Sequence, residues 1–156
     1  MSDVQIPSPV IGPSRTLGHF VSHAAFEHFE HAYAQAMAAL APTGASTVET
    51  SAGSVRAYRF GSASRDLTDR APVVLLSGRD SSTPMWAPVL DGLVGLGRTT
   101  YGLDSVGGPG ASVQTAPLDS TERQAAWVAE AVRGLGIERA HLVGHSLGGW
   151  LAVQVA

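Results

Sequence analysis

The chain has 156 residues, enough for one domain, and its 44% hydrophobic content is ample for a buried core. A formal charge of −3 gives no electrostatic reason to expect binding to nucleic acid or to an acidic membrane. All ten basic residues are arginine and cysteine is absent, which excludes a Walker-type phosphate loop, disulfides, thiol nucleophiles and cysteine-based zinc sites.

Residues 1–45 are expected to be an N-terminal extension with one helix. After a Pro- and Ser-rich start, the pattern predicts a helix over residues 22–40, closed by Pro42 and Gly44. Apolar residues recur along it at three- and four-residue spacing and should pack on the rest of the chain: Phe26, Phe29, Tyr33, Met37 and Leu40.

A second pattern in the same segment has the spacing of metal ligands. Acidic and imidazole side chains recur every four residues, at His19, His23, Glu27 and His31. We favour a solvated polar face, because no further ligands converge from elsewhere in the sequence. No metal site is therefore predicted.

Residues 46–156 alternate short strands with helices. The segments 47–50 and 55–60 flank Ala52-Gly53 and predict a polar hairpin at a sheet edge. Residues 72–76 form a continuous apolar run, which is typical of a strand covered on both faces. The polar loop that follows leads into a predicted helix over residues 85–94, whose shared apolar face comprises Trp86, Leu90 and Leu93.

The alternation continues with a predicted strand over residues 98–104 and a Gly-rich loop at 107–110. Asp119 then opens a helix, with Glu122 placed as in a capping box and Gly134 at the end. A hairpin followed by repeated strand-helix units predicts an α/β fold with a mostly parallel sheet and flanking helices.

The most specific pattern is the hexapeptide Gly144-His145-Ser146-Leu147-Gly148-Gly149. A short apolar stretch typical of a buried strand precedes it, and good helix formers follow it to Ala156. Strand, sharp turn and helix is the context of a nucleophile elbow, in which Gly144 and Gly148 leave room for the turn beside His145. Ser146 is then a candidate nucleophile; a serine that only caps the helix is the alternative.

Backbone N–H groups near this serine could stabilise an oxyanion. The Leu147 N–H lies at a helix N-terminus, where the dipole favours negative charge. A second donor is expected from the loop after residues 72–76, and the N–H of Arg79, directly after Gly78, is our candidate. An ordinary connecting loop is the alternative.

On these residues the chain resembles the N-terminal half of an α/β-hydrolase of the serine esterase-like kind. The resemblance covers roughly residues 46–156 and rests on the segments 75–79, 101–107 and 142–150. It implies Ser146 as the nucleophile, Arg79 and Leu147 as backbone oxyanion donors, a small ester-like substrate and no cofactor. Many members of the family carry His or Pro where this chain has Ser77, which bears on substrate preference more than on chemistry.

A serine nucleophile also needs a general base and an acid that orients the base. The family places both after the nucleophile, yet residues 147–156 contain no Asp, Glu or His. Upstream, His141 lies too deep in its strand and the His145 side chain diverges from its neighbour. Asp80 and Asp104 are expected to hold their own loops.

We therefore expect a hydrolase truncated after the elbow. Its last strand would form an exposed, hydrophobic sheet edge, open to a second chain or to self-association. Two functions remain: a serine hydrolase that acts on an ester or related acyl bond through an acyl-enzyme, with acid and His missing, or a catalytically inert hydrolase-like fragment or binding module.

Other classes find less support. A Rossmann oxidoreductase is disfavoured because no Gly-x-Gly-x-x-Gly follows a predicted strand. No signal-peptide pattern, glycosylation sequon or long apolar run is apparent, so we predict a cytoplasmic protein that has no membrane partner.

Overall fold

The computed structural model describes residues 9–61 and 70–156. The part of the expected Pro- and Ser-rich start that falls in residues 1–8 lies outside the described residues. The elements in chain order are α1 (His23–Leu40), β1 (Gly44–Thr50), β2 (Gly53–Phe60), β3 (Val73–Leu76), the 3₁₀ helix η2 (Thr83–Trp86), α2 (Ala87–Gly95), β4 (Thr100–Leu103), β5 (Val113–Gln114), α3 (Thr121–Gly134), β6 (His141–Gly144) and α4 (Leu147–Val155).

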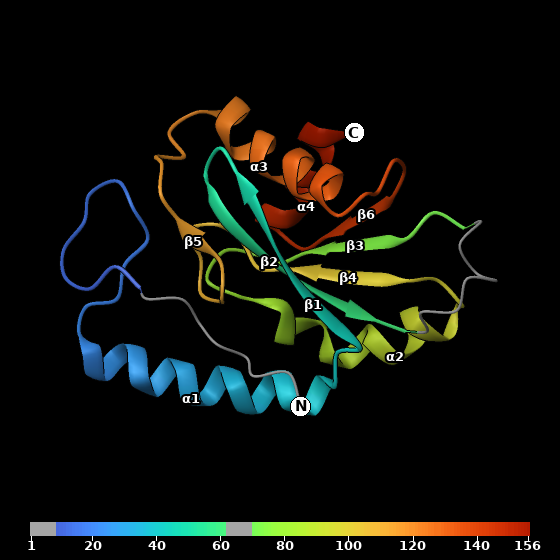
Figure 1. Cartoon of the computed structure of the whole chain (residues 1–156), viewed down its shortest axis with the longest axis horizontal. Coiled ribbons are helices and arrows are strands. Elements are labelled where there is room, and N and C mark those ends of the chain that lie inside the picture. Colours follow the sequence, from blue (N-terminus) through green and yellow to red (C-terminus); the bar gives the residue numbers. More distant parts are fainter. Residues whose placement is uncertain (1–8, 62–69) are drawn as a thin grey trace.

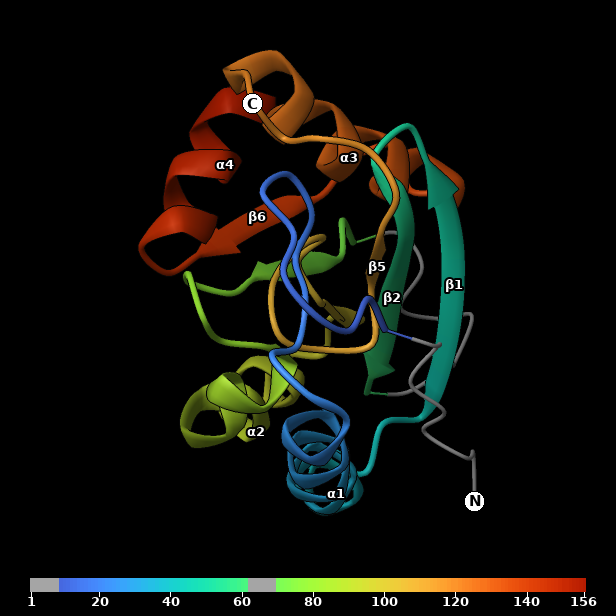
Figure 2. The same cartoon turned by 90° about the vertical axis from the view of Figure 1, so that its left-hand side faces the viewer.

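A twisted sheet separates two helical layers, with α1 and α2 on one face and α3 and α4 on the other (Figure 1, Figure 2). The strand order is β1-β2-β4-β3-β6, and β5 pairs with β2 outside this path. β3 is parallel to both β4 and β6, whereas the pairs that involve β2 are antiparallel. The predicted α/β class is confirmed, and the sheet is mixed.

The burial of β3 on both faces of the sheet explains why its sequence is apolar at every position. Val74 and Leu76 belong to the core beneath α3 and α4, whereas Val73 and Leu75 belong to the core beneath α1 and α2. All four side chains are buried. Because successive strand residues point to opposite faces, a strand covered on both faces needs apolar residues at every position.

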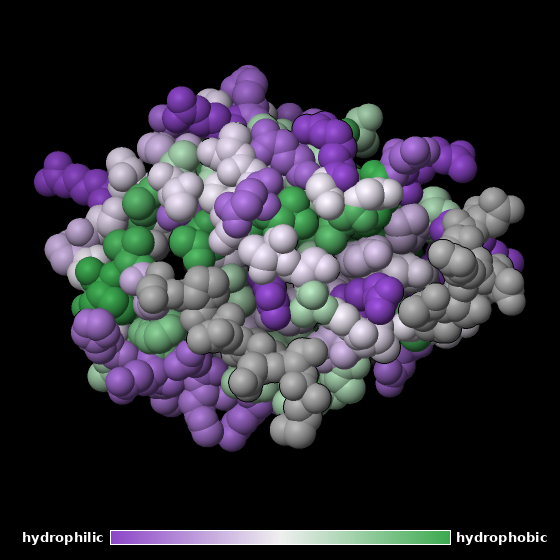
Figure 3. All heavy atoms as spheres, in the orientation of Figure 1, coloured by the Kyte–Doolittle hydropathy of each residue, from purple (hydrophilic) through white to green (hydrophobic). Residues whose placement is uncertain are grey.

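The apolar stripe of α1 packs on the sheet, as predicted. Ser22 caps this helix, since its side chain accepts a hydrogen bond from the Ala25 N–H. Tyr33 and Met37 are buried in the core beneath α1 and α2, and the remaining residues of the stripe pack against this core. The opposite face carries exposed His and Glu side chains, along the lower border of Figure 3.

Two strands differ in burial from the expectation, and one strand was not predicted. The expected hairpin is present and its first strand, β1, lies at the sheet edge, but β2 is interior and largely buried because β1 and β4 pair on its two sides. β5 was not predicted at all. β6 is an edge strand of the described sheet, as expected for the last strand, and Val143 is 36% exposed, whereas the apolar stretch by itself predicted a buried strand.

The cap of α3 also differs from the prediction. Ser120, not Asp119, is the N-cap: its hydroxyl accepts a hydrogen bond from the Arg123 N–H at 3.3 Å. Asp119 instead forms an exposed ion pair with Arg123 at 3.2 Å. The helix continues through Gly134, and Gly136 beyond it takes a positive φ of 72°.

Asp104 follows β4, and its fully buried carboxylate joins three separate segments. One oxygen accepts from the Thr83 N–H at 2.9 Å and from the Thr83 hydroxyl at 2.8 Å. The other accepts from the Ala111 N–H at 2.9 Å and from the Tyr33 hydroxyl. The hydroxyls of Tyr33 and Tyr58 are 2.9 Å apart; because each carries one hydrogen, Tyr58 donates to Tyr33.

Burial raises the pKa of Asp104, and the hydrogen bonds from Tyr33, Ala111 and Thr83 act in the opposite direction. Burial also raises the pKa of Tyr33, and the neighbouring carboxylate adds to this, so the hydroxyl keeps the proton that it donates. A buried carboxylate is tolerated where its lone pairs are hydrogen-bonded. Asp104 thus couples α1, the start of η2 and the segment before β5.

Asp104→Ala should lower the free energy of unfolding by about 3 kcal/mol or more, because it leaves several buried donors without an acceptor. Urea denaturation of the purified protein measures this change. Asp119→Ala is the matched control, and its exposed ion pair should contribute less than about 1 kcal/mol. Equal losses in the two variants would show that the buried network does not stabilise the fold.

Candidate active site

Ser146 occupies a strained position between β6 and α4. Its φ of 53° and ψ of −117° are unusual for a residue with a side chain. The residue is exposed at the carboxyl end of β6. Although it stands at the N-cap of α4, its side chain makes no capping hydrogen bond. The hydroxyl is therefore not committed to holding the helix.

The flanking glycines are required by close backbone contacts. A Cβ atom at Gly148 would lie 2.0 Å from the Leu76 carbonyl oxygen at the end of β3. A Cβ atom at Gly144 would lie 2.2 Å from the Gly148 carbonyl group. The His145 N–H donates to the same Leu76 oxygen at 3.1 Å, which ties the turn to β3. The strand, sharp turn and helix expected here are present.

The loop after β3 packs directly on this turn. A Cβ atom at Gly78 would lie 2.7 Å from His145 Nδ1, so the two segments touch at Gly78. The loop turns at Asp80, whose φ is 58°, and both the N–H and the hydroxyl of Ser81 donate back to the Gly78 carbonyl. Ser77 is buried, and its hydroxyl has no hydrogen-bond partner among the described residues.

The two candidate oxyanion donors line one cavity of about 440 Å³, together with residues of the loop after β4. This volume is in the usual range of small-molecule sites. Within residues 9–61 and 70–156, no hydrogen bond is donated by the N–H of Arg79 or of Leu147. β3, β4 and β6 are mutually parallel in order β4-β3-β6, so their carboxyl ends gather these loops at one edge of the sheet.

The other titratable residues considered from the sequence are differently placed. Asp104 is buried and hydrogen-bonded as described above. His141 begins β6, at the end of the strand opposite Ser146. His145 is exposed and contacts Gly78, and Asp80 is exposed and lines the same cavity as Arg79.

The described residues do not form a metal centre. Across residues 9–61 and 70–156, no three His, Asp or Glu side chains come together in a way that could hold an ion. His19 precedes α1, with Nδ1 3.2 Å from the Leu17 carbonyl oxygen, and His31 Nε2 lies 3.0 Å from Gln35 Nε2. In the same part of the chain, no helix has both the length and the apolar character needed to span a membrane.

Sequence reasoning missed two parts of this region. Thr83 and Tyr33 hold Asp104, and Gln114 binds the N-terminal segment; Tyr33 was expected only as a packing residue of α1, and the other two did not stand out in the sequence. Their partners lie far away in the chain, so no local spacing marks them. Only the Gly-rich loop before Gln114 hinted at an unusual backbone there.

Residues 71–156 match the family model described as alpha/beta hydrolase fold. Carboxylesterase YbfK of Bacillus subtilis is 35% identical over 81 residues, which cover 52% of this chain and 27% of the relative. The crystal structure of carboxylesterase CesB (YbfK) from the same organism superimposes with a TM-score of 0.73 at 28% identity, covering 83% of this chain and 44% of that one.

A second solved structure, naproxen esterase from Bacillus subtilis, has the same fold, with a TM-score of 0.73 at 24% identity. The alignment covers 86% of this chain and 45% of that one. The chain therefore spans less than half the length of these similar structures.

Gly148→Ala should lower the free energy of unfolding by about 1–3 kcal/mol or more, because its Cβ has no space beside the backbone of β3. Gly92→Ala is the matched control: nothing lies within 4 Å of its Cβ position in α2. This control should gain roughly 0.5–1 kcal/mol through helix propensity. Chemical denaturation compares the two, and a neutral Gly148→Ala would contradict the tight contact.

Proposed function

The chain belongs to the alpha/beta hydrolase fold family, and from this premise we propose that it carries the nucleophile and the oxyanion hole of a carboxylesterase-like serine hydrolase. One observation supports this proposal most: a strained, uncapped Ser146 directly precedes Leu147, which lines one cavity with Arg79, and the N–H groups of Leu147 and Arg79 donate no hydrogen bond in the described structure. Strain of this kind is characteristic of sites where a side chain must be presented for reaction.

In the proposed reaction, Ser146 Oγ attacks the carbonyl carbon of an ester while a base takes the hydroxyl proton. The tetrahedral intermediate carries its negative charge on the former carbonyl oxygen. The N–H groups of Arg79 and Leu147 would donate to that oxygen, and the N-terminus of α4 favours the same charge. Collapse expels the protonated alcohol and leaves an acyl-enzyme, which water hydrolyses to release the acid.

We propose that the base and its acid come from polypeptide outside these 156 residues. Residues 147–156 supply neither; among the upstream candidates Asp104 is buried, His141 lies at the opposite end of β6 and His145 contacts Gly78. The similar carboxylesterase structure is more than twice as long as the part that this chain covers. No cofactor is needed for this chemistry.

The proposed substrate is a small ester or related acyl compound, in keeping with the carboxylesterases that the chain resembles. The cavity beside Arg79 has the volume of a small-molecule site. The cytoplasmic location remains a prediction from the sequence. The expected absence of nucleic acid and membrane partners also remains a prediction.

A binding module without activity is the second candidate, and the exposure of β6 favours it. Val143 on β6 and Trp150 and Val153 on α4 are exposed. In this alternative, further strands or a second copy of the chain would pair with the outer edge of β6.

Ser146→Ala in the intact protein should reduce hydrolysis of p-nitrophenyl butyrate by about 10³-fold or more, because the nucleophile is lost. Release of p-nitrophenol, followed by absorbance, gives the rates. Ser46→Ala, at an exposed site on β1, is the matched control and should keep the full rate. Equal rates for both variants, or no hydrolysis by the unmodified protein, would favour the binding module.

A further inference from the structure

The N-terminal segment before α1 is a closed loop rather than a loose extension. Residues 9–20, here called the strap, return on themselves: the Gly12 N–H donates to the Phe20 carbonyl and the Phe20 N–H to the Val10 carbonyl, each at 2.9 Å. The Phe20 ring packs on Phe26 and Phe29 of α1, with centroids 5.2 Å and 5.4 Å away. Figure 2 shows the strap beside β5.

Gln114 fastens the strap to the sheet. Its Oε1 accepts from the Gly18 N–H at 2.7 Å, and its Nε2 donates to the Thr16 carbonyl at 3.2 Å and to the Ala116 carbonyl at 2.8 Å. The amide is buried and uses three of its four hydrogen-bonding positions. Gly18 also approaches the backbone closely, since a Cβ atom there would lie 2.6 Å from the Gly107 carbonyl oxygen.

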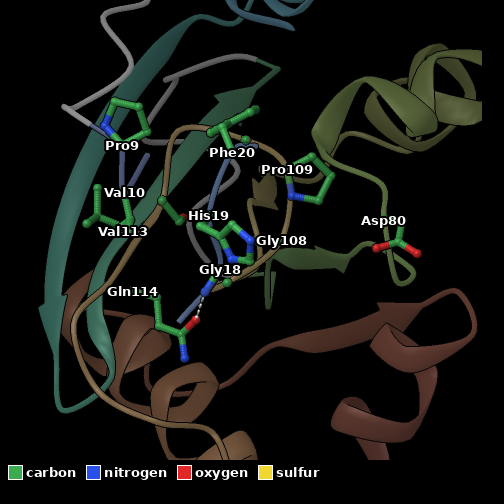
Figure 4. A pocket seen from close by; sticks show the side chains of 13 residues that line it. Pro9, Val10, Gly18, His19, Phe20, Asp80, Gly108, Pro109, Val113 and Gln114 are labelled. Atoms are coloured by element: carbon green, nitrogen blue, oxygen red, sulfur yellow. Dashed lines mark hydrogen bonds between the residues drawn. The ribbon is translucent and has the colours of Figure 1, made fainter. Parts of the chain in front are cut away.

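The strap borders two cavities. Thr16 lines the cavity that contains Arg79 and Leu147, and Gly18 lines a second cavity of about 360 Å³ (Figure 4). The residues common to both linings are Asp80, Gly107, Gly108 and Gln114. Gln114 bonds to the strap at Thr16 and Gly18, so its side chain stands where one cavity meets the other.

We infer that the strap is a wall of the substrate pocket and that Gln114 limits the length of the acyl chain that the pocket accepts; this inference rests on the proposed function. The leaving alcohol must face the general base, which returns a proton to it. Arg79 and Leu147, the proposed oxyanion donors, line one cavity together with Gln114. In this inference the acyl chain of the substrate lies in that cavity, and the hydrogen bonds of Gln114 to the strap close the cavity where it meets the second one.

The second cavity has a partly apolar lining, with His19, Asp80 and Gln114 among its polar members. Its apolar members include Val10, Phe20 and Val113, and Pro9 and Pro109 lie near them in Figure 4. Breaking the bonds from Gln114 would open the first cavity toward this apolar space. A longer acyl chain could then bury its extra methylene groups there.

The test measures binding without hydrolysis, in the intact protein carrying Ser146→Ala. Isothermal titration gives dissociation constants for methyl butyrate and methyl decanoate. Adding Gln114→Ala should raise the affinity for methyl decanoate relative to that for methyl butyrate by about tenfold or more. Contacts between a pocket and several methylene groups can produce a change of this size. Gln35→Ala, on the exposed face of α1, is the matched control and should leave the ratio unchanged.

Gly18→Ala provides a second variant, because it displaces the strap while Gln114 is kept. Thermal melting of each variant checks that it is folded. A shifted affinity ratio with both variants supports the inference that the strap is a wall of the pocket. This result would hold even if the protein that retains Ser146 hydrolysed neither ester, in which case the proposed reaction alone would fail. An unchanged ratio with both, or no binding of either ester, would overturn the inference.

Discussion

The close backbone contact between the first turn of α4 and the end of β3 governs the geometry of the site. Gly148 lies against the Leu76 carbonyl with no room for a side chain, and the His145 N–H donates to the same oxygen. The chain must therefore reverse sharply after Gly144, and Ser146 takes the strained, positive-φ conformation that this reversal demands. Packing against β3 balances the conformational strain, which is the usual condition for a strained residue to persist.

The turn before α4 also fixes one end of the loop that carries Arg79, and a buried carboxylate fixes the other end. Gly78 abuts His145 at the start of the loop, while Asp104 holds Thr83 at its end through the N–H and the hydroxyl. Tyr33 extends this support to α1. Donors held in advance need no reorganisation when charge develops on a substrate, which is the main source of oxyanion stabilisation.

Elements with a strong local signal could be predicted from the sequence. The continuous apolar run of β3, the spacing along α1 and the glycines of the elbow each report a constraint among neighbours in the chain. The contacts of Asp104 and Gln114 could not be predicted in full. Asp104 does hold its own loop at Ala111, as expected, but it also binds Tyr33, 71 positions away; Gly18 and Gln114 are 96 positions apart. The interior position of β2 was missed because a local pattern does not say which strands pair beside it.

That Ser146 is the nucleophile is tested most directly by mass spectrometry of the intact protein after reaction with a fluorophosphonate. Such reagents phosphonylate a serine that a base has activated, and tandem spectra of the digested protein locate the adduct. We predict one phosphonyl group, carried by the Ser146 hydroxyl. An adduct on a different serine, or none at all, would contradict the proposed role of Ser146 and would leave the strained geometry of the turn without a catalytic purpose.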